Sequence, residues 1–241
     1  MSANKFLYPL FDHWFRGGNI WLYSDPHFSD DEMKYIRKDY IGDEEQVKRI
    51  NSKVGKNDTI IILGDIGNTD WVKKIRGYKV LIMGNHDSGK SNYQRIIKDY
   101  ETFDSSEIGT EDIKTKEIWT KMHGRMEVLD MEYYKKYFHQ HHEDNHLFDE
   151  VYEGPLMINE KFMLSHEPLR LPDNCIFNIH GHDHSNWFQQ PNHLNVCAEW
   201  INYTPVSLLE MFKKGAFKGV DDIHRITIDK ATKKAKEKEN E

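Results

Sequence analysis

Five short clusters of polar residues in this sequence share aspartate, asparagine and histidine. They are Asp25-Pro26-His27, Gly64-Asp65, Gly84-Asn85-His86-Asp87, His166 and Gly181-His182-Asp183-His184. Carboxylate, amide and imidazole groups are ligands with which proteins hold divalent cations such as manganese, iron or zinc. Together the clusters indicate a site for two metal ions that activates water for hydrolysis.

Each cluster follows an apolar segment that has the composition of a β-strand. These segments are residues 19–24, 59–63, 79–83, 157–165 and 175–180. The run 59–63 is continuous and rich in β-branched residues, which is typical of a parallel strand covered on both faces. Because ligands of open α/β sheets bind at the carboxyl ends of the strands, we expect the five clusters to meet along one sheet edge.

Other segments complete the expected alternation of strands and helices. Helices are predicted over residues 43–53 and 69–76 from their spacing of apolar residues, and a further helix is expected to begin at Ser207. Additional strands are predicted over 194–198 and 225–229. The pattern predicts an α/β fold.

Length and composition favour one domain. The chain has 241 residues, 38% hydrophobic residues and a net charge of −7, so it has no general positive field for a polyanion. Cys175 and Cys197 lie in apolar segments, which indicates buried, reduced thiols. Neither a signal peptide nor a membrane-length apolar run is present, so we expect a soluble cytoplasmic protein.

One stretch, residues 101–150, interrupts this alternation. It is crowded with tyrosine, lysine and histidine near its end, and we expect it to form an inserted helical cap. Residues 1–228 are then a single domain that carries this insertion. Residues 229–241 are charged and lack apolar periodicity, which predicts a disordered tail.

The positions of the polar residues suggest how two ions would be shared. Asp65 directly follows a predicted strand, and a carboxylate there can bridge two ions about 3.5–4 Å apart. Asp25 and His27 are two residues apart at a strand end and can share one ion, while Asn85 offers an amide oxygen to the other. Imidazoles complete the two ligand sets: His166, His182 and His184.

In this order and strand context, the motifs resemble those of the calcineurin-like metallophosphoesterases over about residues 20–211. The resemblance implies a four-layer α/β/β/α sandwich, in which helices flank two mixed β-sheets. It also implies two ligand sets, which are Asp25, His27, Asp65 and His184 for one ion and Asp65, Asn85, His166 and His182 for the other. His86 is then the general acid near the leaving group, a role that suits an imidazole without an assigned ion.

These features predict a two-metal-dependent phosphoester hydrolase whose nucleophile is a metal-bound hydroxide. Many family members carry a second carboxylate three positions after the bridging one, where this chain has Asn68. The Arg-Gly pair that follows the Gly-Asn-His motif in phosphoprotein phosphatases is also missing. Both differences favour a phosphodiesterase that acts on a small or nucleotide-like substrate, although Asn68 could simply cap a helix.

Several hypotheses stay open at this stage. The chain could be a phosphomonoesterase or a nuclease of the same superfamily, or, in a different class, a metal-binding scaffold for protein interactions. Long nucleic acid is disfavoured by the acidic composition. Arg170 is a candidate donor to a substrate phosphate, and Asp87 and Asp183 could either orient imidazoles or lie exposed. Mn²⁺ is the expected cofactor, with iron and zinc as alternatives.

Overall fold

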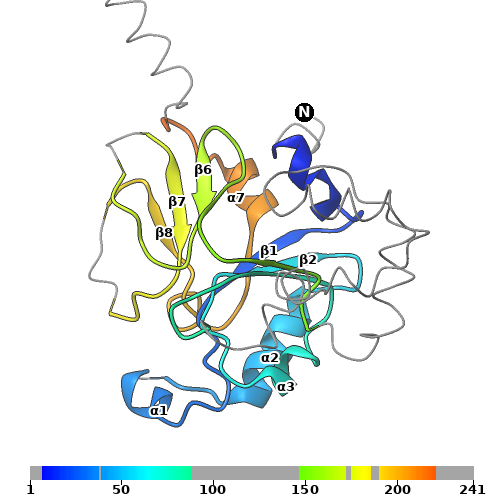
Figure 1. Ribbon diagram of the computed structural model, residues 1–241, viewed down its shortest axis with the longest axis vertical. Coiled ribbons are helices and arrows are strands. Elements are labelled where there is room, and N and C mark those ends of the chain that lie inside the picture. The colour runs from blue at the N-terminus through cyan, green and yellow to red at the C-terminus, as the bar shows by residue number, and fades with distance from the viewer. Residues whose placement is uncertain (1–6, 38, 88–146, 172–174, 186–189, 221–241) are drawn as a thin grey trace, which may run out of the picture. The chain divides into compact units, whose positions relative to one another are not determined.

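The computed structural model describes residues 7–37, 39–87, 147–171, 175–185 and 190–220, which form two β-sheets with flanking helices (Figure 1). One sheet has five strands in the order β4-β3-β2-β1-β9, and the other has four in the order β5-β6-β7-β8. Both are mixed, because β9 is antiparallel to β1 and β5 is antiparallel to β6, whereas the remaining pairs are parallel.

Most strands lie in or overlap the predicted apolar segments, whereas β4 and β9 lie outside them. The strands are β1 (Ile20–Tyr23), β2 (Thr59–Ile62), β3 (Tyr78–Ile82), β4 (Glu150–Tyr152), β5 (Leu156–Met157), β6 (Phe162–Leu164), β7 (Phe177–His180), β8 (His193–Asn195) and β9 (Val206–Ser207). The helices are η2 (Pro9–Trp14, a 3₁₀ helix), α1 (Met33–Ile36), α2 (Asp43–Lys53), α3 (Thr69–Val72) and α7 (Leu208–Lys214).

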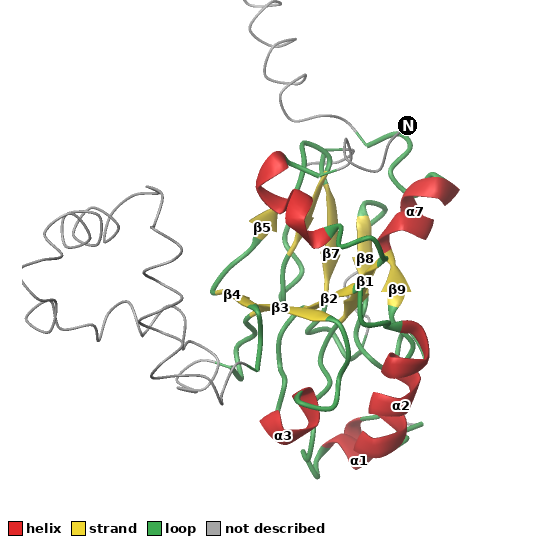
Figure 2. Ribbon diagram, turned by 90° about the vertical axis from the view of Figure 1, so that its right-hand side faces the viewer, coloured by secondary structure: helices red, strands yellow, loops and turns green. Residues whose placement is uncertain are grey.

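The main core lies between the two sheets. Alternate residues of the five-stranded sheet, such as Ile61 and Val80, form one buried cluster with Phe162 and Ile179 of the other sheet. Trp14 of η2 belongs to the same cluster. Helices α2 and α3 lie on the opposite side of the five-stranded sheet (Figure 2), so its central strands are covered on both faces, as the continuous apolar run in β2 predicts.

Two helices begin with side-chain caps. Asn68 accepts a hydrogen bond from the backbone N–H of Asp70 at the start of α3, and Ser207 accepts one from Glu210 at the start of α7. Asn68 therefore caps a helix, which was one of the two roles considered for it; the other was to mark a phosphodiesterase by replacing a carboxylate. Helix α3 ends at Val72 and is shorter than the predicted segment 69–76.

Most of the predicted architecture is confirmed, with one correction. The two mixed sheets of an α/β fold are present, and Cys175 and Cys197 are buried and free. The prediction of a single strand over 157–165 is wrong, because this segment is a hairpin of β5 and β6. Asn159 forces the turn: its side chain accepts the backbone N–H groups of Lys161 and Phe162.

Some predictions fall on other parts of the chain. The inserted cap over 101–150 lies almost entirely outside the described residues, as do the strand over 225–229 and the tail over 229–241. Glu150, the last residue of the expected insertion, begins β4 beside β3. No helix within the described ranges is long and apolar enough to cross a membrane.

Candidate metal centre

The loops that follow β1, β2, β3, β6 and β7 carry the five polar clusters. Backbone hydrogen bonds extend the pairing of β1 and β2 into these loops, from Asp25 N to Gly64 O at 3.1 Å and from His27 N to Asp65 O at 3.0 Å. On the other sheet, Gly181 N donates to His166 O at 2.8 Å. The side chains are thus held by backbone that continues directly from the strands.

The backbone adopts left-handed conformations at four of the predicted ligands. The φ angles are 53° at Asp25, 45° at His27, 54° at Asp65 and 64° at His182. Such a conformation costs a non-glycine residue about 1–2 kcal/mol. Strain of this kind at several neighbouring positions is typical of functional sites, where it turns the chain sharply and aims side chains toward one point.

The first group of side chains contains Asp25, His27 and His184, whose candidate ligand atoms lie within 4.8 Å of one another. Asp25 Oδ1 is 3.9 Å from His27 Nε2 and 3.7 Å from His184 Nε2. Asp25 Oδ1 and His27 Nε2 are both buried and have no hydrogen-bond partner among the described residues. A buried polar atom without a partner costs about 1–3 kcal/mol, so a cation bound here would satisfy both atoms.

The second group contains Asp65, His166 and His182, and Asn85 lies against it. Asn85 Oδ1 is 2.9 Å from His166 Nε2 and 3.1 Å from His182 Nδ1. His166 Nδ1 donates to the backbone oxygen of Leu63 at 2.7 Å, which directs Nε2 toward the group. Three potential ligand atoms therefore converge beside Asp65, and they suit a second divalent ion.

Asp65 lies between the two groups. Its Oδ2 atom is 3.5 Å from His27 Nε2 and 3.4 Å from His166 Nε2. Burial raises the pKa of Asp65, but its hydrogen bond to His166 and the other positive neighbours outweigh burial and bring the pKa to about 2. Burial lowers the pKa of His166, whereas Asp65 and Asp25 raise it to about 9 in the ion-free protein.

Glycines allow these groups to approach closely. Gly64 has φ of 90°, and a Cβ at this position would lie 2.6 Å from Gly84 N and from His166 Nδ1. At Gly181, a Cβ would overlap the side chains of Ser24 and Asp25. Space thus requires glycine before these ligands, and at Gly64 the left-handed backbone conformation favours glycine as well.

Arg37 and Glu199, which the sequence did not indicate, contact the ligands of the first group on the side away from the candidate ion. His184 Nδ1 lies 2.5 Å from Glu199 Oε1, and Glu199 Oε2 forms an ion pair of 3.1 Å with Arg37 Nε. The Arg37 side chain is 0% exposed, and its Nη2 donates to the backbone oxygen of Asp25 at 2.5 Å. Arg37 and Glu199 therefore tie His184 to Asp25, an arrangement that orients a ligand imidazole. No motif marks them, because they lie far apart in the sequence.

Asp87 has a structural role that its sequence context left open. Its buried carboxylate accepts the backbone N–H groups of Asp65 at 2.8 Å, Ile66 at 3.0 Å and Gly84 at 2.8 Å. Asp87 thereby joins the loops after β2 and β3 and orients backbone rather than imidazoles. Asp183 is buried too, so it does not lie exposed.

Asp25 is fixed by a similar set of donors on its second oxygen. Asp25 Oδ2 accepts hydrogen bonds from the hydroxyl of Ser24, from His182 N at 2.9 Å and from Cys197 Sγ at 3.2 Å. Burial raises the pKa of Cys197, so this thiol stays protonated and can donate. With Oδ2 held in this way, Oδ1 is left facing the two imidazoles of the first group.

His86 and Arg170 lie at the surface. The ring centroid of His86 is 5.5 Å from that of His27, and the His86 backbone N–H donates to Asp65 Oδ1 at 2.9 Å. His86 is exposed and belongs to neither candidate metal group. Arg170 is also exposed, and its role toward substrate stays a prediction.

A carboxylate between two groups of imidazoles, at the edge of a sheet, is suited to two neighbouring divalent ions that act on one substrate. Comparison with known proteins gives the family. The sequence matches the family model of the calcineurin-like phosphoesterases over residues 18–202. The chain therefore belongs to this family of metal-dependent hydrolases that act on phosphoester bonds. Its members typically bind two metal ions, for which the two groups described above are the candidates.

One solved structure shows a limited similarity. It is a protein of unknown function from Aquifex aeolicus, which is 20% identical in sequence, with a TM-score of 0.49 over 81% of this chain and 98% of that chain. Among curated proteins, none matches this sequence significantly.

The shifted pKa values predict how the stability of the ion-free protein depends on pH. His166 has a pKa of about 9 when folded and an ordinary value of 6.5, so its contribution is complete below pH 6.5 and is lost as pH rises through about 9. Asp65 has a pKa of about 2 when folded and an ordinary value of 3.8. Its contribution to the free energy of unfolding is therefore complete above pH 3.8 and is lost as pH falls through about 2. We expect urea unfolding in chelator to show a smaller free energy at pH 9 than at pH 6.5.

His166→Gln is the control, because it removes this titrating group and should flatten the slope between pH 6.5 and 9. An equal slope in wild type and variant would contradict the role given to the His166–Asp65 pair.

Glu199→Gln tests the support of His184. A neutral amide is a weaker acceptor for the imidazole N–H and loses the ion pair with Arg37, so we expect affinity for one of two Mn²⁺ ions to fall by about 10–100-fold. Competition with a chelating dye measures the affinity and the number of ions per chain. Glu44→Gln, an exposed change of equal charge, should bind both ions normally. Two ions of unchanged affinity in Glu199→Gln would refute the proposed support.

Proposed function

We propose that this chain is a phosphodiesterase that uses two divalent ions to hydrolyse small or nucleotide-like phosphodiesters. One ion would be held by Asp25, His27, Asp65 and His184, and the other by Asp65, Asn85, His166 and His182. Mn²⁺ suits this mixture of carboxylate, amide and imidazole groups, and iron and zinc are the alternatives.

The observation that carries this proposal is the position of Asp65 Oδ2, within 3.5 Å of one imidazole group and 3.4 Å of the other. A single carboxylate oxygen in this position can be shared by two ions, which is the arrangement that two-metal hydrolysis requires. When bound, two divalent ions neutralise the phosphoryl oxygens and lower the pKa of the attacking water.

In this proposal, His86 supplies the proton that the leaving group needs. It lies beside His27 and is exposed to solvent, so a departing alkoxide can reach its imidazole N–H. The hydrogen bond from the backbone N–H of His86 to Asp65 Oδ1 holds His86 next to the shared carboxylate. A neighbouring imidazole that binds no ion can act as a general acid near neutral pH.

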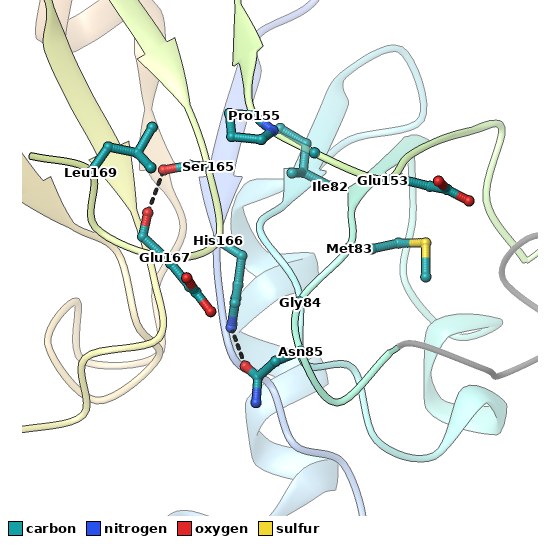
Figure 3. Close-up of a pocket in the computed structure, with 11 residues that line it drawn as sticks. Ile82, Met83, Gly84, Asn85, Glu153, Pro155, Ser165, His166, Glu167 and Leu169 are labelled. Atoms are coloured by element: carbon teal, nitrogen blue, oxygen red, sulfur yellow. Dashed lines mark hydrogen bonds between the residues drawn. The ribbon is translucent and has the colours of Figure 1, made fainter.

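A pocket beside Asn85 and His166 supports the proposed preference for diesters over monoesters (Figure 3). The described residues of its lining include Glu153 and Glu167 and contain no lysine or arginine. A phosphate monoester carries about one more negative charge than a diester near neutral pH, because the second pKa of such phosphates is about 6. An acidic lining therefore penalises the monoester more strongly. Arg170 would then be a donor to the single charged phosphate of the substrate.

The central test is turnover of Mn²⁺-loaded protein on bis(4-nitrophenyl) phosphate and on 4-nitrophenyl phosphate, with chelated protein as the blank. We expect a higher kcat/KM for the diester, because the ions supply the positive charge and the pocket disfavours a dianion. A preference for the monoester would assign a phosphomonoesterase, and activity confined to nucleic acid would assign a nuclease. Two bound ions without turnover would favour the scaffold hypothesis.

His86→Ala tests the general acid. We expect kcat to fall by about 10²–10⁴-fold for an alkyl leaving group, with a smaller loss for 4-nitrophenolate, which departs without a proton. Metal content should stay at the wild-type value, because His86 belongs to neither candidate metal group. His13→Ala, another exposed histidine, serves as the matched control. An equal loss for both leaving groups would count against His86 as the acid.

A further inference from the structure

The pocket beside the candidate metal centre is formed where the two sheets meet. Its volume is about 270 Å³, and three segments line it: the end of β3 with the residues after it, the connection from β4 to β5, and the loop after β6. Figure 3 shows Met83, Pro155 and Leu169 around it, with His166 hydrogen-bonded to Asn85 on the side of the second metal group. A pocket that shares two predicted ligands with the metal centre is open to a substituent of the bound phosphate.

The position of His86 decides which substituent enters. His86 is absent from the lining of the pocket, although its neighbour Asn85 is part of it. If His86 protonates the departing alkoxide, the leaving group must lie near His86 and His27, outside this pocket. The pocket is then left for the alcohol that remains on phosphorus after hydrolysis.

The walls of the pocket define the chemistry of this retained group. Ile82, Met83, Pro155 and Leu169 supply apolar surface, and the thioether of Met83 can adapt to different shapes. Glu153 and Glu167 are both exposed, and neither forms an ion pair with a described residue. Two carboxylates beside an apolar surface attract a cation and repel an anion.

We propose that this pocket binds the retained alcohol of the diester and selects a compact group that is positively charged or neutral, while it rejects a group that carries a further phosphate. The inference rests on the proposed function and narrows its substrate class. It excludes nucleoside polyphosphates and nucleic acid as preferred substrates. The volume of the pocket limits the retained group to about the size of one ring or one short branched chain.

Three matched esters test the selection by charge. All are diesters that release 4-nitrophenolate, and their retained groups are choline, its uncharged isostere 3,3-dimethylbutanol, and 2-phosphonoethanol. Attack of water breaks the bond from phosphorus to the nitrophenyl oxygen and leaves the phosphate monoester of the retained alcohol. We expect kcat/KM of the Mn²⁺-loaded protein to be about tenfold or more higher for the choline ester than for the phosphonate ester. Each of the two carboxylates contributes about a few-fold through its interaction with the charge of the retained group.

Variants of the two carboxylates assign the effect. In the double variant Glu153→Gln, Glu167→Gln, the ratio of kcat/KM for the choline ester to kcat/KM for the phosphonate ester should fall about tenfold. The control double variant, Glu44→Gln, Glu160→Gln, changes net charge equally at residues that do not line the pocket, and its ratio should stay within about twofold. An unchanged ratio in the first variant, or an equal change in both, would overturn the proposal.

Filling the pocket tests its location independently of charge. Met83→Trp should lower kcat/KM for all three bulky esters and leave methyl 4-nitrophenyl phosphate nearly unaffected, because a methyl group does not need the pocket. A uniform loss across all four esters would show that the retained group lies elsewhere.

Failure of this inference and failure of the proposed function give different results. If wild type hydrolyses the esters but prefers the phosphonate, the function stands and the pocket proposal fails; loss of that preference in Arg170→Gln would assign the anion to Arg170. If no ester is hydrolysed, the proposed function fails. Calorimetric binding of phosphocholine against 2-phosphonoethyl phosphate then still tests the pocket, and tighter binding of the phosphonate would overturn it.

Discussion

The carboxylate of Asp65 stands within 3.5 Å of imidazoles from two separate loops, and this crowding governs how the surrounding chain is built. The ends of β2 and β3 can come so close only because Gly64 and Gly84 lack side chains. The loops must also turn sharply, which places Asp25 and Asp65 in left-handed conformations that cost about 1–2 kcal/mol each. The buried strands beneath the site provide the stability that offsets this strain.

Buried polar groups around the centre hold the loops, and each has a defined set of partners. Asp87 joins two loops through three backbone N–H groups, while Arg37 and Glu199 connect the loop after β1 to His184. Such groups are stable only when nearly all their donors and acceptors are paired. Asp25 Oδ1 and His27 Nε2 have no hydrogen-bond partner among the described residues, and an ion bound there would pair them.

The distribution of charge has a consequence for substrates. Arg37 is buried, where it pairs with Glu199, and none of the described residues that line the pocket beside the site is a lysine or arginine. Under the proposed function, positive charge for a phosphate would come from bound ions and from exposed residues such as Arg170. The proposed selection against substrates with extra phosphates is in keeping with the net charge of −7.

Local signals in the sequence were sufficient to predict most of the strand segments and the helix that begins at Ser207, and they offered a cap as one of two explanations for Asn68, because each depends on neighbours a few residues away. The candidate ligands were predicted from the order and strand context of five motifs, and the structure brings six of them together in two groups. Tertiary structure alone decided which imidazole faces which carboxylate, that Arg37 and Glu199 support His184, and that residues from three loops enclose a pocket. These contacts join residues far apart in the chain, and pairing at such distances leaves no periodicity or spacing to detect. The hairpin of β5 and β6 was missed because both strands are apolar and only Asn159 marks the turn between them.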